Sequence, residues 1–148
     1  MRLGRGDAFC HLGRYFSRVP SFLSPVLRSP TTRFELVNGR TGRVFVSQLE
    51  VAVDSATRNK GLLGRDGLEP GRGLVIAPTN AVHTFFMRFP IDVVFVARDG
   101  RVVKIRHAVP ARRITAAFRA FAVIELPAGT AATELARGDQ VVLRERAS

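Results

Sequence analysis

The chain has 148 residues, of which 46% are apolar, and this is enough for one globular domain with a core of ordinary size. Its formal net charge of +11 is spread unevenly, because residues 1–43 hold eight arginines against two acidic residues. Cys10 is the only cysteine, which excludes an intramolecular disulfide and a cysteine-based metal cluster and is compatible with a reducing, cytoplasmic compartment.

Residues 1–32 are predicted to be a disordered basic leader. Pro20, Pro25 and Pro30 interrupt any long amphipathic helix, and no stretch has the apolar character of a secretory signal. No apolar run in the chain approaches the ~20 residues of a membrane-spanning helix, so we expect a soluble protein. Because much of the basic charge gathers in the leader rather than on one face of a domain, nucleic acid is not expected as a partner.

Short apolar runs separated by turn residues begin at Phe34 and predict a β-rich domain over residues 33–148. The runs 34–37 and 44–46 flank Asn38-Gly39, and Asp99-Gly100 follows another run in the same way. These residue pairs favour type I′ hairpin turns, since both turn positions need a positive φ.

Two short helices are predicted between the strands. The first begins with Asp54 or Ser55 as its cap and runs toward Leu63, and the second covers residues 128–137 and ends at Gly138. Most other connections are too short for the crossovers that parallel strands need. We therefore predict a mainly β (α+β) fold, an antiparallel β-sandwich or barrel-like domain of about seven or eight strands with two short helices.

Three sequence blocks occur in order: GLLGR at 61–65, HTFFMRFPID at 83–92 and VIELPAG at 123–129. In their order and spacing they resemble the prokaryotic domain of unknown function 192 family, over roughly residues 45–143. The resemblance implies a compact β-rich sandwich-like fold and no established reaction. Many members of the family carry Trp-Met-Lys-Asn-Thr where this chain has residues 86–90, so this chain lacks that Asn-Thr pair.

Five polar residues in these blocks form a candidate ligand-binding site. Asp92 and Glu125 each lie in an apolar strand, on a face shared with apolar neighbours. A carboxylate in such a place needs a cation or several hydrogen bonds, because burying it alone is costly. Arg65, His83 and Arg88 are the candidate partners.

Four interpretations of these residues stay open. They are buried or rim ion pairs that hold the first helix and the central hairpin to the sheet, or they line a cleft for a small polar or anionic ligand without catalysis. Alternatively, a small hydrolase-like enzyme uses Asp92 or Glu125 as a general base, or the domain is an interaction module with a basic tail. His83 and His107 lack metal-ligand spacing, so no metal and no cofactor are expected.

Overall fold

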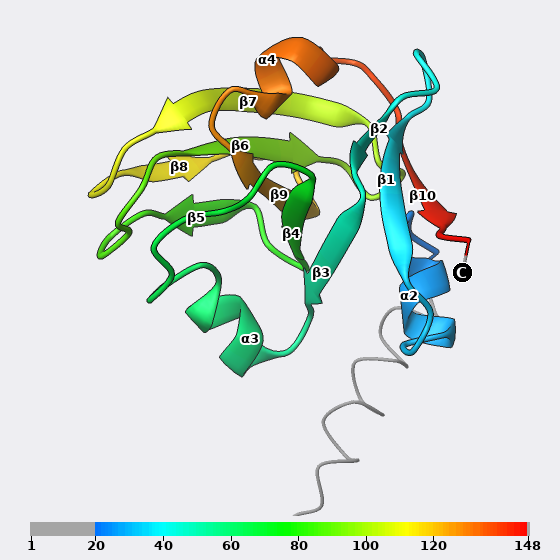
Figure 1. Ribbon diagram of the computed structural model, residues 1–148, viewed down its shortest axis with the longest axis horizontal. Helices are drawn as coiled ribbons and strands as arrows, with labels where there is room; N and C mark the ends of the chain where they lie inside the picture. Colours follow the sequence, from blue (N-terminus) through cyan, green and yellow to red (C-terminus); the bar gives the residue numbers. More distant parts are fainter. Residues whose placement is uncertain (1–19, 148) are drawn as a thin grey trace, which may run out of the picture.

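A five-stranded sheet lies at the centre of the computed structural model, which describes residues 20–147 (Figure 1). Its strands are β3 (Gln48–Ala52), β4 (Arg72–Ile76), β6 (Ile91–Val96), β7 (Val102–Val109) and β9 (Ala122–Pro127). The order across the sheet is β3-β4-β9-β6-β7, which leaves β9 in the middle. Neighbours run antiparallel except β3 and β4, which are parallel.

Two smaller sheets lie on opposite faces of the central sheet. A three-stranded sheet has the order β10-β1-β2, with β1 at Phe34–Asn38, β2 at Val44–Val46 and β10 at Val141–Glu145. A two-stranded sheet pairs β5 (Ala81–His83) with β8 (Ile114–Ala116). The predicted mainly β fold is therefore confirmed as an open, layered α+β arrangement, and residues 20–147 form ten strands instead of seven or eight.

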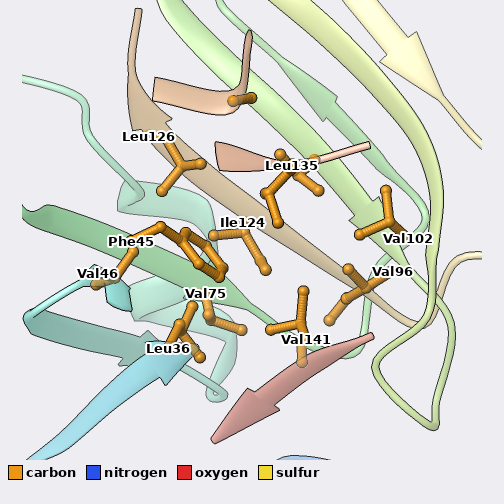
Figure 2. Close-up of a cluster of buried hydrophobic side chains, with 14 of the residues drawn as sticks. Leu36, Phe45, Val46, Val75, Val96, Val102, Ile124, Leu126, Leu135 and Val141 are labelled. Carbon is orange, nitrogen blue, oxygen red and sulfur yellow. The ribbon is translucent and has the colours of Figure 1, made fainter. Parts of the chain in front are cut away.

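The central sheet divides the core into two clusters. On one face Leu36 and Val141 from the three-stranded sheet pack near Ile124 of β9, within the cluster that Figure 2 shows. On the other face Phe95 of β6 belongs to a second cluster against which Val82 of β5 packs. All six residues of β6 are buried, which explains why five of them are apolar with no alternation of apolar and polar positions, Asp92 being the one polar residue.

In the described part of the chain three short helices lie around the sheets: α2 (Ser24–Arg28), α3 (Ser55–Lys60) and α4 (Thr130–Glu134). The cap predicted for α3 is confirmed, because Asp54 Oδ1 accepts the Thr57 N–H at 2.9 Å. Within residues 20–147 no helix combines the length and the apolar character needed to cross a membrane.

The parallel pair β3–β4 is an exception to the antiparallel pairing that the short connections predict. After β3, the chain forms α3 and then a loop before it enters β4 at Arg72. A connection of this length carries the chain back to the end of the sheet where β3 began, so β4 runs in the same direction as β3. β3 pairs only with β4 among the described strands and forms one edge of the central sheet.

Both predicted hairpins form, but neither has the predicted type I′ turn. Asn38 is the last residue of β1, and a longer loop with Gly42 at φ 72° leads into β2. In the β6–β7 turn Gly100 alone has a positive φ, of 92°, and Asp99 Oδ1 accepts the Arg101 N–H. A Cβ at Gly100 would lie 2.4 Å from the Val141 carbonyl oxygen, so both backbone conformation and space require glycine there.

The described part of the predicted leader packs on the domain. Residues 20–32 include α2, and Leu23 is fully buried in the cluster that also holds Leu36 and Val141. The Phe22 N–H donates to the carbonyl of Arg98 in the β6–β7 turn at 2.9 Å. Residues 1–19 lie outside the described residues, and for them a disordered leader stays a prediction.

We expect Leu23→Ala to lower the free energy of unfolding by about 2–5 kcal/mol, because it empties a filled position in the core. Chemical denaturation monitored by circular dichroism measures the change. Val142→Ala is the matched control, since Val142 is 42% exposed. If both variants lose the same small amount of stability, the segment before β1 does not contribute to the core.

Candidate functional site

The two candidate carboxylates point to opposite faces of the central sheet. In the pairing of β6 with β9, Asp92 lies opposite Leu126 and Val93 lies opposite Glu125. Side chains directly opposite each other share a face, and consecutive residues alternate between faces. Asp92 and Glu125 therefore belong to different sides of the sheet, and the structure does not assemble the five predicted residues into one site.

Asp92 is a buried hydrogen-bond acceptor for the backbone. Its Oδ1 accepts the Ala108 N–H at 2.8 Å, and its Oδ2 accepts the N–H groups of Gly129 and Ala131 at 3.0 and 2.9 Å. The side chain is fully buried, and these contacts tie the start of α4 and the end of β7 to β6. This arrangement fits a structural role for Asp92.

Glu125 is buried without a comparable set of partners. It lies in β9 between Leu74 of β4 and Val93 of β6, and only 5% of the residue is exposed. Its Oε2 atom has no hydrogen-bond partner among the described residues. Burial raises the pKa of this carboxyl to about 7, and the charge of Arg65 opposes that rise only in part.

Arg65 is engaged by another acid. Its two terminal nitrogens donate to the two oxygens of Glu50 at 2.9 and 2.7 Å, a two-point contact that lowers the pKa of Glu50. Arg65 acts on Glu125 through its charge, which the attached Glu50 carboxylate partly neutralises. Arg65 was predicted to pair with Asp92 or Glu125, but its hydrogen bonds go to the partly exposed Glu50, an acid that the sequence interpretation did not include.

A cavity of about 360 Å³ lies next to Glu125 and the end of α3. Gly61 ends the helix with a φ of 45°, and a Cβ there would lie 3.9 Å from Glu125 Oε2, so the backbone passes close to the carboxylate. The residues that bear polar or charged groups on this cavity are Arg58, Asn59, Lys60, Thr79, His83 and Glu125.

Two of the five predicted residues, His83 and Glu125, line this cavity. Arg88 instead pairs with Asp66 at 2.6 Å, and both side chains are largely exposed. Sequence reasoning missed Arg58 and Lys60, which directly precede the 61–65 block. Basic residues in the last turn of a helix are typical because they favour the helix dipole, so their type alone carried no functional signal.

Residues of β3 line a larger hollow of about 750 Å³, which also reaches Arg146. Sequence reasoning did not identify it. Its Glu50 carboxylate already accepts hydrogen bonds from Arg65 and lies near Arg72. We favour the smaller cavity as the candidate site because it contains the buried carboxylate oxygen without a partner.

We expect Asp92→Ala to lower the free energy of unfolding by about 3 kcal/mol or more, because it leaves three backbone N–H groups without their acceptor. Thermal and urea unfolding measure the loss. Asp66→Ala, which removes an exposed acid from a surface pair, is the control and should change stability little. Equal effects of the two substitutions would contradict a structural role for Asp92.

The raised pKa of Glu125 predicts a pH dependence of a definite sign. The folded protein binds a proton that the unfolded chain releases near pH 4.5, so stability falls as the pH rises from 4.5 through about 7. Glu125→Gln removes the group that titrates. The variant should therefore gain stability relative to wild type with rising pH, by up to about 3 kcal/mol at pH 8.

Urea unfolding between pH 4.5 and 8 measures this difference, with Glu69→Gln at an exposed position as the control. A Glu125→Gln profile that runs parallel to the wild-type profile would show that the carboxyl is not held neutral by burial.

Comparisons with known proteins agree with this fold. The sequence profile of the family described as "Uncharacterized ACR", domain of unknown function 192, matches residues 36–143. A crystal structure of a candidate transcription regulator from Sinorhizobium meliloti 1021 is 25% identical, with a TM-score of 0.65, over 74% of this chain and 91% of that one. A crystal structure of a protein of unknown function from Novosphingobium aromaticivorans DSM 12444 is 28% identical, with a TM-score of 0.64, over 74% and 82% of the two chains.

The comparison with curated proteins found no match. The three sequence blocks at 61–65, 83–92 and 123–129 all lie inside the matched range, and the matched strands form the layered sheets described above. The chain is a member of the domain of unknown function 192 family.

Proposed function

We propose that the cavity beside Glu125 binds a small polar ligand that carries an anionic group. The observation that carries this proposal is the unpartnered Oε2 of a buried carboxyl that opens onto a cavity lined by cationic side chains. A buried acceptor without a partner is costly, and a ligand that donates a hydrogen bond to it removes that cost.

The lining suggests how such a ligand would be oriented. Arg58 holds its place through a hydrogen bond from Nη1 to the Pro78 carbonyl at 2.9 Å, whereas Lys60 and His83 are exposed at the rim. An anionic group near Lys60 and His83 would leave the donor end of the ligand near Glu125. A volume of about 360 Å³ is at the lower end of typical ligand sites and fits a molecule the size of a small metabolite.

The test is a thermal-shift screen of inorganic phosphate, sulfate, amino acids, sugar phosphates and nucleoside monophosphates, because a ligand that binds only the folded state raises the melting temperature. We expect one class of compound to stabilise the protein. Lys60→Ala and His83→Ala should abolish that shift while changing the melting temperature of the free protein little, since both side chains are exposed.

Arg88→Ala is the matched control, because Arg88 also belongs to the 83–92 block but pairs with Asp66 instead of lining the cavity. It should keep the ligand response. Arg146→Ala tests the larger hollow in the same way. The proposal is contradicted if no compound raises the melting temperature, or if only Arg146→Ala abolishes the response.

A hydrolase-like enzyme with Glu125 as its general base is the second candidate. A carboxyl with a pKa of about 7 in a cavity is suited to accept and return a proton near neutral pH. Asp92, whose two oxygens both accept backbone N–H groups, offers no such proton acceptor. Turnover of a bound compound by the wild type but not by Glu125→Gln would favour this candidate over simple binding.

A further inference from the structure

The outer face of the β5–β8 sheet is apolar and exposed. Along each strand the middle residue points inward, since Val82 packs against the core and Thr115 is buried, so the flanking residues point outward. In the register of the two strands His83 lies opposite Ile114. We call the following outward set, which includes the loop residues next to the strands, the Phe face: His83, Phe85, Phe86, Ile114, Ala116 and Phe118.

The Phe face exposes its large side chains to an unusual degree. Phe118 is 93% exposed, Phe86 84% and Ile114 72%. The other exposed large apolar residues of the described chain are Val44 and Val142, which are about half as exposed and belong to the three-stranded sheet. The three most exposed large apolar side chains of the described residues thus belong to one two-stranded sheet and its loops, and a concentration of this kind marks an interaction site more often than scattered exposure does.

Buried Thr84 holds the two loops that end this face. Its N–H donates to the Arg113 carbonyl at 2.8 Å and its hydroxyl donates to the Pro110 carbonyl at 2.6 Å. Its own carbonyl accepts the N–H groups of Met87 and Arg112 at 3.2 and 3.1 Å. Thr84 therefore holds the two exposed loops together through several hydrogen bonds.

These loops contain strained backbone. Phe86 and Arg112 have φ angles of 65° and 63°, in the left-handed region that residues with a side chain rarely occupy. Such strain persists only where surrounding contacts hold the backbone in place, and it gathers at functional sites. Both residues lie in the loops that Thr84 joins, and both side chains are exposed.

The two segments that form the Phe face carry positive charge only, and Asp66 from the loop before β4 reaches this region by pairing with Arg88. Residues 100–124 contain six lysines and arginines and no acidic residue, and residues 79–91 contain Arg88 and no acidic residue. Arg112, Arg113 and Arg119 are exposed and lie within five residues of Ile114 or Phe118. Apolar side chains surrounded by arginines match a surface that is apolar beneath and negatively charged at its boundary.

We propose that the Phe face docks on an anionic lipid bilayer, with Phe86, Ile114 and Phe118 entering the headgroup boundary. The arginines then contact lipid phosphates. A bilayer suits the face better than nucleic acid does. The strand residues of the face, Ile114 and Ala116, are aliphatic, and the nearby Thr84 and Thr115 are buried. The face therefore offers few groups that could hydrogen-bond to bases. His83 belongs both to this face and to the lining of the cavity beside Glu125, so the tests of docking use Phe86, Phe118 and the arginines, which do not line that cavity.

The test is co-sedimentation of the full chain with vesicles of phosphatidylcholine alone and of phosphatidylcholine mixed with an equal amount of phosphatidylglycerol. We expect binding to the mixed vesicles, weakened by salt, and little binding to phosphatidylcholine alone. Phe86→Asn with Phe118→Ser should weaken it at least about tenfold, as two apolar side chains are lost; asparagine is chosen because it tolerates a positive φ. The triple variant Arg112→Gln, Arg113→Gln and Arg119→Gln should weaken vesicle binding by on the order of 100-fold, because each basic residue near an anionic surface contributes about 1 kcal/mol to binding.

Matched controls separate the Phe face from overall charge. Val44→Ser with Val142→Ser removes two exposed apolar residues elsewhere, and Arg28→Gln, Arg33→Gln and Arg137→Gln removes the same charge from exposed positions elsewhere. Both should bind the mixed vesicles nearly as well as wild type. Circular dichroism melting verifies that every variant is folded.

Several results would overturn the proposal. Equal losses for the two triple arginine variants would assign binding to net charge, including that of residues 1–19. Tighter binding to a single-stranded oligonucleotide than to vesicles, reduced by the same substitutions, would assign the face to nucleic acid. A dimer in sedimentation equilibrium that the Phe86→Asn and Phe118→Ser variant loses would assign it to a second copy of the chain.

Discussion

The double burial of β6 and β9 is the constraint on which the rest of the structure depends. Apolar clusters cover both faces of these strands, so a polar side chain on either strand must find its partners inside the protein. Asp92 finds three backbone N–H donors, and these bonds connect β6 to α4 and to the end of β7. Glu125, on the other face, retains one oxygen without a partner.

The difference between the two carboxyls separates scaffold from candidate site. The hydrogen bonds to Asp92 hold elements that are distant in sequence, and its loss would disconnect them. Glu125 lies beside a cavity and carries a raised pKa, so the fold bears a cost at that position when the carboxyl is ionised. Groups held at a cost to stability are typical of binding and catalytic sites, which is why Glu125 anchors the proposed function.

The burial of the candidate carboxyls could be predicted from the sequence, but whether they share one face of the sheet could not. Apolar neighbours correctly indicated that Asp92 and Glu125 are buried. Their separation depends on the register of β6 against β9, in which Val93 and not Asp92 lies opposite Glu125. A shift of one residue would put both carboxyls on one face, and because both faces of β6 and β9 are apolar, the pattern of apolar residues does not select the register.

Local signals determined much of the fold by themselves: the apolar runs that became strands, the Asp54 cap of α3 and the glycine of the β6–β7 turn. These features depend on residues within one turn or strand, where hydrogen bonding and side-chain spacing act directly. The tertiary structure alone decided the parallel β3–β4 pair, the burial of Leu23 and the pairing of Arg65 with Glu50. Each of these joins segments far apart in the chain, and their contact exists only because burying apolar surface brings the sheets together.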